Sequence, residues 1–124
     1  MILYGYALSS ASFRVRIALA LKNIPYTSVI KNLRVGEHRL AEYLNINAQG
    51  FVPALQMDDA NVLTQSVAIM EYLDEQYPDP ALLPSDAIGR ARVRDGLFSQ
   101  ELHLLKDSAV PKLSSAAAQL DLAK

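Results

Sequence analysis

Hydrophobic and polar positions follow two different periods along the first 77 residues. Short β-branched and aromatic runs, typical of strands, alternate with segments in which apolar residues recur every three or four positions, typical of amphipathic helices. The predicted strands cover residues 2–6, 26–30, 52–57 and 62–64. The predicted helices cover residues 11–22, 37–44 and 65–77.

The spacing within two of these helices also predicts the side that faces the core. Residues three or four positions apart lie on the same side of a helix. The apolar residues that share such a face are Phe13, Ile17, Ala20 and Leu21 in the first helix and Ile69, Tyr72 and Leu73 in the third.

The order of elements, β-α-β-α-β-β-α, predicts a mixed sheet covered by helices. The first two strands, joined through a helix, are expected to be parallel with a right-handed crossover. The last two strands are separated only by the short polar turn at residues 58–61, so they are expected to form an antiparallel hairpin. This is a thioredoxin-like arrangement, and we assign residues 1–77 to it.

Three prolines mark the end of this domain. Pro78, Pro80 and Pro84 lie in a segment that we interpret as a linker, residues 78–88. Helical spacing returns from residue 89 to about 107 and again, more weakly, after Pro111, which interrupts it. Residues 89–124 are therefore expected to form a partial all-α domain.

Composition narrows the possible functions. The 124 residues carry 12 basic and 13 acidic side chains, a net charge of −1, so neither nucleic acid nor a membrane surface is an expected partner. There is no cysteine, which excludes thiol redox chemistry by the protein and is consistent with the cytoplasm. The two histidines, His38 and His103, lie far apart, so no metal site is expected.

The first helix is preceded by hydroxyl groups. Ser9 and Ser10 follow the first strand, and a helix start of this kind attracts a negative charge, because its free N–H groups and its dipole both favour an anion. The alternative is that these serines only cap the helix. From the residues alone the capping interpretation is favoured.

Three ordered motifs resemble the zeta-class glutathione transferases. Residues 9–19, SSASFRVRIAL, resemble that class's SSCxWRVRIAL, with Ala11 and Phe13 in place of its cysteine and tryptophan. Residues 47–55, NAQGFVPAL, resemble NPxxxVPAL, and residues 65–73, QSVAIMEYL, match QSxAIxEYL. The resemblance covers about residues 1–94.

The resemblance implies a function for the chain. Zeta-class members include maleylacetoacetate and maleylpyruvate isomerases, which use glutathione as cofactor. The implied reaction is cis–trans isomerisation of a maleyl-type keto acid: thiolate adds to the double bond, rotation follows, and thiolate leaves. The resemblance also implies a cytoplasmic homodimer that binds glutathione and a small electrophilic or maleyl-type acid.

Eight residues are candidate glutathione contacts by this resemblance. Ser9 would donate its hydroxyl to the sulfur with support from Ser10, and both are candidate catalytic residues. Arg14 would add positive potential. The remaining expected roles are main-chain pairing with the cysteinyl unit and a cis peptide at Val52 and Pro53, binding of the γ-glutamyl carboxylate at Gln65 and Ser66, and contact with the glycyl end at His38.

Each of these residues also has a purely structural interpretation. Ser66 can cap a helix, Pro53 can begin an edge strand, and His38 can be a solvated helix residue. Two further functions stay open: a general glutathione transferase, and a non-catalytic binding module on the same fold. The chain can also be a fragment of a longer enzyme, because little of the helical domain is present.

Overall fold

The computed structural model describes residues 1–107, with side chains to residue 97. The chain divides into two compact units, Met1–Leu82 and Leu83–Lys124. The predicted break at Pro111 and the helix after it lie outside the described residues. No helix in the described part is both long and apolar enough to cross a membrane.

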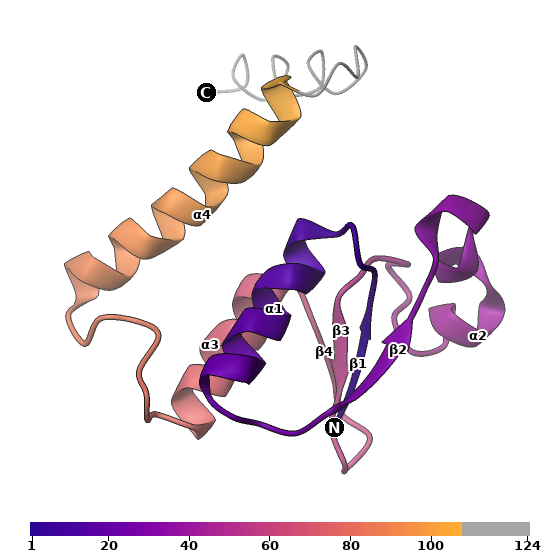
Figure 1. Ribbon diagram of the computed structural model, residues 1–124, viewed down its shortest axis with the longest axis horizontal. Helices are drawn as coiled ribbons and strands as arrows, with labels where there is room; N and C mark the ends of the chain where they lie inside the picture. The colour runs from indigo at the N-terminus through magenta and orange to yellow at the C-terminus, as the bar shows by residue number, and fades with distance from the viewer. Residues whose placement is uncertain (108–124) are drawn as a thin grey trace. The chain divides into compact units, whose positions relative to one another are not determined.

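The first unit is built on a four-stranded sheet in the order β2-β1-β3-β4 (Figure 1). Its strands are β1 (Ile2–Gly5), β2 (Thr27–Ile30), β3 (Ala54–Gln56) and β4 (Val62–Thr64). The β1 and β2 strands are parallel, whereas β3 is antiparallel to both β1 and β4. The predicted parallel pairing of the first two strands and antiparallel pairing of the last two are therefore confirmed.

Helices cover both faces of this sheet. Figure 1 shows α1 (Ser10–Leu21) and α3 (Ser66–Gln76) on one face and the short α2 (Ala41–Leu44) on the other. Successive strand residues point to opposite faces, so Leu3 and Leu55 are buried under α1 and α3, while Tyr4 and Ala54 are buried on the α2 side.

The predicted inward face of α1 is wrong. Phe13, Ile17 and Leu21 are 54%, 43% and 58% exposed. The buried residues of the helix are Ser12, Val15, Ala18 and Leu19. Apolar residues lie almost all round α1, so spacing alone does not select a face, and the contact with the sheet and α3 decides it. The inward face predicted for α3 is confirmed at Ile69 and Leu73, which are both fully buried.

The predicted helix at 37–44 is broken. A 3-10 turn at Glu37–Arg39 is followed by α2 only from Ala41, because Leu40 takes an extended conformation between them (φ −69°, ψ 143°). Another 3-10 turn, Leu33–Val35, lies in the segment expected to be irregular and ends at Gly36, whose φ of +80° is left-handed. The third strand is shorter than expected and begins only at Ala54.

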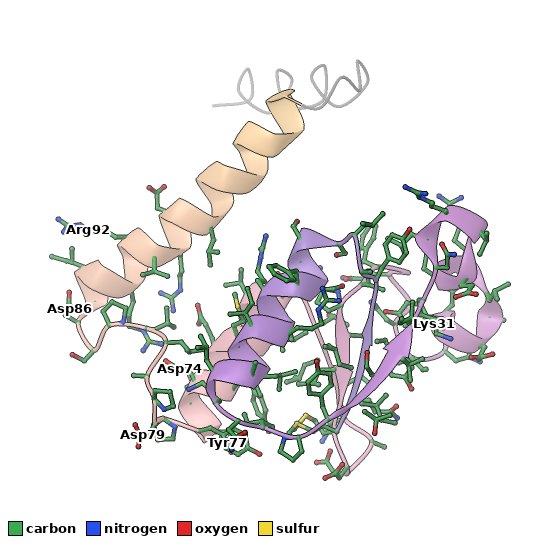
Figure 2. All side chains as sticks on the ribbon, in the orientation of Figure 1. Lys31, Asp74, Tyr77, Asp79, Asp86 and Arg92 are labelled. Atoms are coloured by element: carbon green, nitrogen blue, oxygen red, sulfur yellow. The ribbon has the colours of Figure 1, made fainter. Side chains whose placement is uncertain are left out.

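A buried lysine ties the ends of the two long helices of the first unit together. Lys22 follows α1, and its side chain is fully buried. Its ammonium donates to Asp74 Oδ1 at 2.8 Å, to the Pro80 carbonyl at 2.8 Å and to the Tyr77 carbonyl. Asp74 also accepts from the Leu82 N–H at 2.7 Å, so the segment after α3 (Figure 2) is held against the first unit.

The second unit contains one described helix, α4 (Ala87–Asp107). It begins two residues before the predicted start. Asp86 accepts hydrogen bonds at this start, through its carboxylate from the Gly89 N–H at 2.7 Å and through its carbonyl from the Arg90 N–H at 3.1 Å. The helix therefore begins inside the segment that the sequence analysis interprets as a linker.

Candidate functional site

The sheet topology gathers three of the predicted site segments at one end of the first unit. Tyr4 in β1 lies opposite Ala54 in β3, and Ala54 lies opposite Thr64 in β4. Because β3 is antiparallel to both β1 and β4, the end of β1, the start of β3 and the end of β4 lie at the same end of the sheet, which we call the site edge. The start of α1, the Val52–Pro53 peptide and the start of α3 therefore belong to one region.

Ser9 is the N-cap of α1. Its Oγ accepts a hydrogen bond from the Ser12 N–H at 3.1 Å, so the capping interpretation is confirmed for Ser9. Capping uses an acceptor lone pair and leaves the hydroxyl hydrogen to be donated elsewhere. Ser10 is the first residue of the helix and is exposed. The N-terminal N–H groups of α1 and two hydroxyls therefore lie at the same edge.

The start of α3 differs from the expected capping arrangement. Gln65 occupies the cap position with φ +67° and makes no capping hydrogen bond through its side chain. Ser66 is the first helical residue rather than the cap, so its predicted capping role is wrong. Its hydroxyl instead accepts from Arg14 Nη1 at 3.2 Å, and Ser66 is buried. This hydrogen bond joins the starts of the two helices, a pairing that the sequence did not indicate.

The Val52–Pro53 peptide bond is cis, as the resemblance predicts. Pro53 is buried, and Val52 precedes the ladder because β3 begins at Ala54. The carbonyl of the preceding residue, Phe51, accepts from Tyr43 Oη at 2.6 Å and from Asn47 Nδ2 at 2.8 Å. The sequence analysis gave neither Tyr43 nor Asn47 a role in the site. The signal for Asn47 was its place as the first residue of the motif at 47–55.

His38 lies beside the loop that leads to Val52. A Cβ built on Gly50, which has φ +64°, would be 3.2 Å from the His38 carbonyl oxygen, so the two backbones are in close approach. His38 Nδ1 is buried and has no hydrogen-bond partner among the described residues. A buried ring nitrogen is normally hydrogen-bonded, so this atom is an exception among the described residues.

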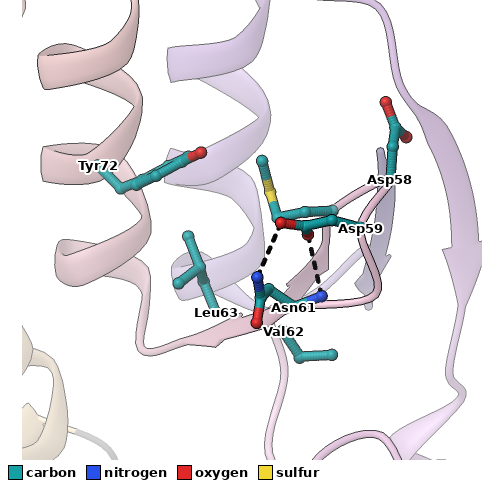
Figure 3. Close-up of a pocket in the computed structure, with 7 residues that line it drawn as sticks. Asp58, Asp59, Asn61, Val62, Leu63 and Tyr72 are labelled. Carbon is teal, nitrogen blue, oxygen red and sulfur yellow. Dashed lines mark hydrogen bonds between the residues drawn. The ribbon is translucent and has the colours of Figure 1, made fainter.

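A hollow lies at the opposite end of the sheet from the candidate site, at the β3–β4 turn. It measures about 440 Å³ and is lined by residues of the turn, of β4 and by Tyr72 of α3 (Figure 3). The polar groups there are partly paired, because Asp59 accepts from the Asn61 N–H at 3.1 Å and from its Nδ2 at 2.8 Å. No predicted site residue lines this hollow.

The described residues contain no group of three or more His, Asp or Glu side chains able to hold a metal ion. The polar groups of the candidate site are instead helix-start N–H groups, serine hydroxyls, one guanidinium and a main-chain edge. These are donors suited to an anionic, peptide-like molecule. The site is therefore chemically compatible with a small peptide that carries carboxylates and a thiolate, as glutathione does.

Comparisons with known proteins agree with this assignment. Residues 3–81 match the family described as "Glutathione S-transferase, N-terminal domain". The chain is 51% identical over 117 residues to maleylacetoacetate isomerase of Pseudomonas aeruginosa, covering 91% of this chain and 55% of that protein. It is also 51% identical over 94 residues to maleylpyruvate isomerase of a Ralstonia species, covering 76% and 44% respectively.

Solved structures show the same similarity. A zeta-class maleyl pyruvate isomerase described as a holo structure has a TM-score of 0.72 at 50% identity, covering 77% of this chain and 44% of that one. Maleylacetoacetate isomerase of Methylobacterium extorquens AM1, with bound malonate and glutathione, has a TM-score of 0.77 at 41% identity, covering 93% and 53%.

Two further facts follow from these matches. An alignment of 117 residues reaches beyond residue 94, so the expectation that the resemblance stops there is wrong. The chain spans about half the length of the relatives it matches. On its matched domain and these identities, this chain belongs to the glutathione S-transferase family, and its relatives include zeta-class members.

Proposed function

We propose that the chain binds glutathione at the sheet edge formed by the starts of α1 and α3 and the cis Val52–Pro53 peptide. The observation that carries the proposal is the convergence of these three segments, each with donors for a different part of the tripeptide. The relatives' names and the glutathione-bound neighbour support the choice of ligand.

The serines at the start of α1 act on the sulfur in this proposal. Ser9 donates its hydroxyl hydrogen to the thiolate, and Ser10 supports it from the first turn of the helix. A free thiol has a pKa of about 8.5, and each unit by which a site lowers it corresponds to about 1.4 kcal/mol of preference for the thiolate. A hydroxyl donor together with a helix N-terminus is suited to supply this preference.

The rest of the tripeptide is assigned to the remaining residues. The Val52 main chain, set by Pro53, pairs with the cysteinyl unit as an added strand. Gln65 together with the N–H and hydroxyl of Ser66 holds the γ-glutamyl carboxylate at the start of α3. Arg14 keeps the Ser66 hydroxyl in place and adds positive charge. His38, whose backbone lies against Gly50 beside this loop, is the proposed contact for the glycyl end.

For the reaction we propose glutathione-dependent cis–trans isomerisation of a maleyl-type keto acid such as maleylacetoacetate or maleylpyruvate. When bound, glutathione supplies the thiolate that adds reversibly to the double bond. The chain's contribution is to orient the tripeptide and to hold its sulfur in the ionised form. Conjugation to another electrophile, as in a general glutathione transferase, needs the same thiolate and is the alternative outcome of the assay below.

Calorimetric titration of the 124-residue chain with glutathione tests the site. We expect the wild-type chain to bind glutathione and Ser66→Ala to bind it with a Kd about tenfold higher, because the variant loses a buried polar group at the carboxylate site. We expect Ser9→Ala to lose the ultraviolet absorption of bound thiolate. Ser28→Ala, an exposed serine of β2, is the matched control and should bind as wild type does.

The outcomes separate the functions. Binding followed by turnover of a maleyl-type acid supports the isomerase, and turnover of other electrophiles alone supports a general transferase. Binding without turnover of either identifies a non-catalytic module. A folded wild-type chain that releases no heat with glutathione contradicts the proposed site.

We also propose that the chain acts in the cytoplasm as a homodimer. Large apolar side chains are exposed in the first unit, Phe13 at 54% and Phe51 at 65%, and association would cover such groups. Sedimentation velocity should give a species of twice the 13.6 kDa chain mass. A single species at the mass of one chain across micromolar concentrations would contradict the dimer.

A further inference from the structure

We infer that Tyr43 and Asn47 are positioning residues for glutathione, because together they fix the Phe51 carbonyl and so the main chain of Val52. This inference rests on the proposed function. It adds to the proposed site two residues that are not themselves glutathione contacts. They act on the site through the loop between α2 and β3.

The Phe51 carbonyl is saturated by these two side chains. Tyr43 Oη lies 2.6 Å and Asn47 Nδ2 lies 2.8 Å from the same oxygen. A carbonyl oxygen has two lone pairs, so both are used and the orientation of the peptide that leads into Val52 is defined. Both donors are buried, Tyr43 completely and Asn47 with 4% of its surface exposed, so water does not compete for the bonds.

Asn47 also shapes the loop itself. Its Oδ1 accepts from the Gln49 N–H at 3.1 Å, and its carbonyl accepts from the Gly50 N–H at 2.9 Å. The Asn47 N–H in turn donates to the Tyr43 carbonyl at 2.9 Å. One asparagine therefore uses its side-chain amide and both main-chain groups to fold residues 47–51 onto the end of α2.

This loop touches the other proposed contact residues. Gln49 Oε1 accepts from Gln65 Nε2 at 3.0 Å, which links the loop to the start of α3. Gly50 closely approaches the backbone of His38. The groups proposed to hold the γ-glutamyl, cysteinyl and glycyl parts of the tripeptide are thus each joined to residues 49–51.

Tyr43 is held rigidly enough to serve this role. Its ring packs at 5.7 Å from the ring of Tyr4, and Lys31 Nζ lies 5.8 Å from its centroid. Burial raises the pKa of the Tyr43 phenol, so the hydroxyl stays a donor at neutral pH. A loop that is ordered before binding spares the ligand the cost of ordering it.

The test compares two variants with a control variant that is expected to lose a similar amount of folding stability. Tyr43→Phe removes one donor to Phe51, and Asn47→Asp removes the other while keeping the acceptor for Gln49. Ile24→Val is the control, because it trims a buried side chain after the far end of α1 and costs stability comparable to one hydrogen bond. Glutathione Kd, Tm and the glutathione-induced NMR shift of the Val52 amide are measured for all three.

We expect the glutathione Kd to rise about tenfold in Tyr43→Phe and at least as much in Asn47→Asp, with a reduced shift of the Val52 amide. Ile24→Val should lower Tm but leave Kd and the amide shift unchanged. The positioning role alone is overturned if the wild-type chain binds glutathione and the Kd is unchanged in both Tyr43→Phe and Asn47→Asp. It is also overturned if Ile24→Val changes the Kd as much as these variants do. A wild-type chain that does not bind glutathione overturns the proposed function and this role with it.

Discussion

At the scale of single residues, several polar groups of the site have more than one role. Ser9 caps α1 through a lone pair and keeps its hydroxyl hydrogen, so capping and thiolate stabilisation do not exclude each other. Ser66 accepts from Arg14 through its hydroxyl, and as the first residue of α3 it has a main-chain N–H without an intrahelical partner. A substitution at either position should therefore change stability and ligand affinity together.

The buried phenol of Tyr43 predicts a loss of stability at alkaline pH. Burial is the largest cause that raises its pKa, opposed by the neighbouring Asn47 amide. Above an unfolded-state pKa of about 10 the unfolded chain releases this proton while the folded chain keeps it, so the free energy of unfolding falls as pH rises.

Tyr43→Phe removes this contribution. At neutral pH the variant should be about 1 kcal/mol less stable than wild type, from the lost hydrogen bond. This difference should narrow as pH rises above about 10. Urea unfolding across the alkaline range measures it, with the partly exposed Tyr77→Phe as control. A constant difference between the two proteins at all pH values would contradict the prediction.

At the scale of elements, the ion pair of Lys22 and Asp74 joins the end of α1 to α3. All three ammonium protons have acceptors, which is the condition under which a buried charge is tolerated. A second pair of nearly equal length, Lys31 and Glu42 at 3.0 Å, lies in the same unit, and its side chains are 12% and 77% exposed. The carboxylate is therefore buried in the first pair and exposed in the second, so removing each one compares the two environments.

Asp74→Ala should lower the free energy of unfolding by about 3–5 kcal/mol, because it leaves a buried ammonium without its counter-charge. Glu42→Ala removes an exposed carboxylate and should cost less than about 1 kcal/mol. Urea unfolding of both variants provides the comparison. In the double variant Lys22→Met with Asp74→Ala, the loss should be smaller than in Asp74→Ala alone, and equal losses would show that the lone charge is not the cause.

At the scale of the whole molecule, every proposed glutathione contact lies in the first unit, Met1–Leu82. A ligand that binds only the folded form stabilises the unit to which it binds. We therefore expect glutathione to stabilise the first unit and to leave the stability of the second unit unchanged.

Hydrogen exchange measured by mass spectrometry tests this division. With glutathione at a hundred times its Kd, amides of the first unit that exchange only through its unfolding should slow roughly hundredfold. Amides of α4, Ala87–Asp107, should keep their rates. Equal protection of α4 would mean that the helix contributes to the ligand site, and no protection anywhere would contradict glutathione binding.

The sequence by itself determined the order and type of the elements in the first unit. Strand composition and the short polar turn at 58–61 act locally, so local patterns are sufficient to predict these elements. The motifs also located the start of α1, the Val52–Pro53 peptide and the start of α3. That these segments meet at one end of the sheet depends on the antiparallel pairing of β1 with β3, which the sequence analysis did not predict.

Only the tertiary structure decided which groups meet. Phe13 and Ile17 are exposed because the sheet contacts another side of α1, and a helix that is apolar nearly all round does not encode that choice. The bonds from Arg14 to Ser66, and from Tyr43 to the Phe51 carbonyl, join residues on different elements. Such partners depend on the relative placement of packed elements, which is set by long-range contacts and not by the spacing of residues along the chain.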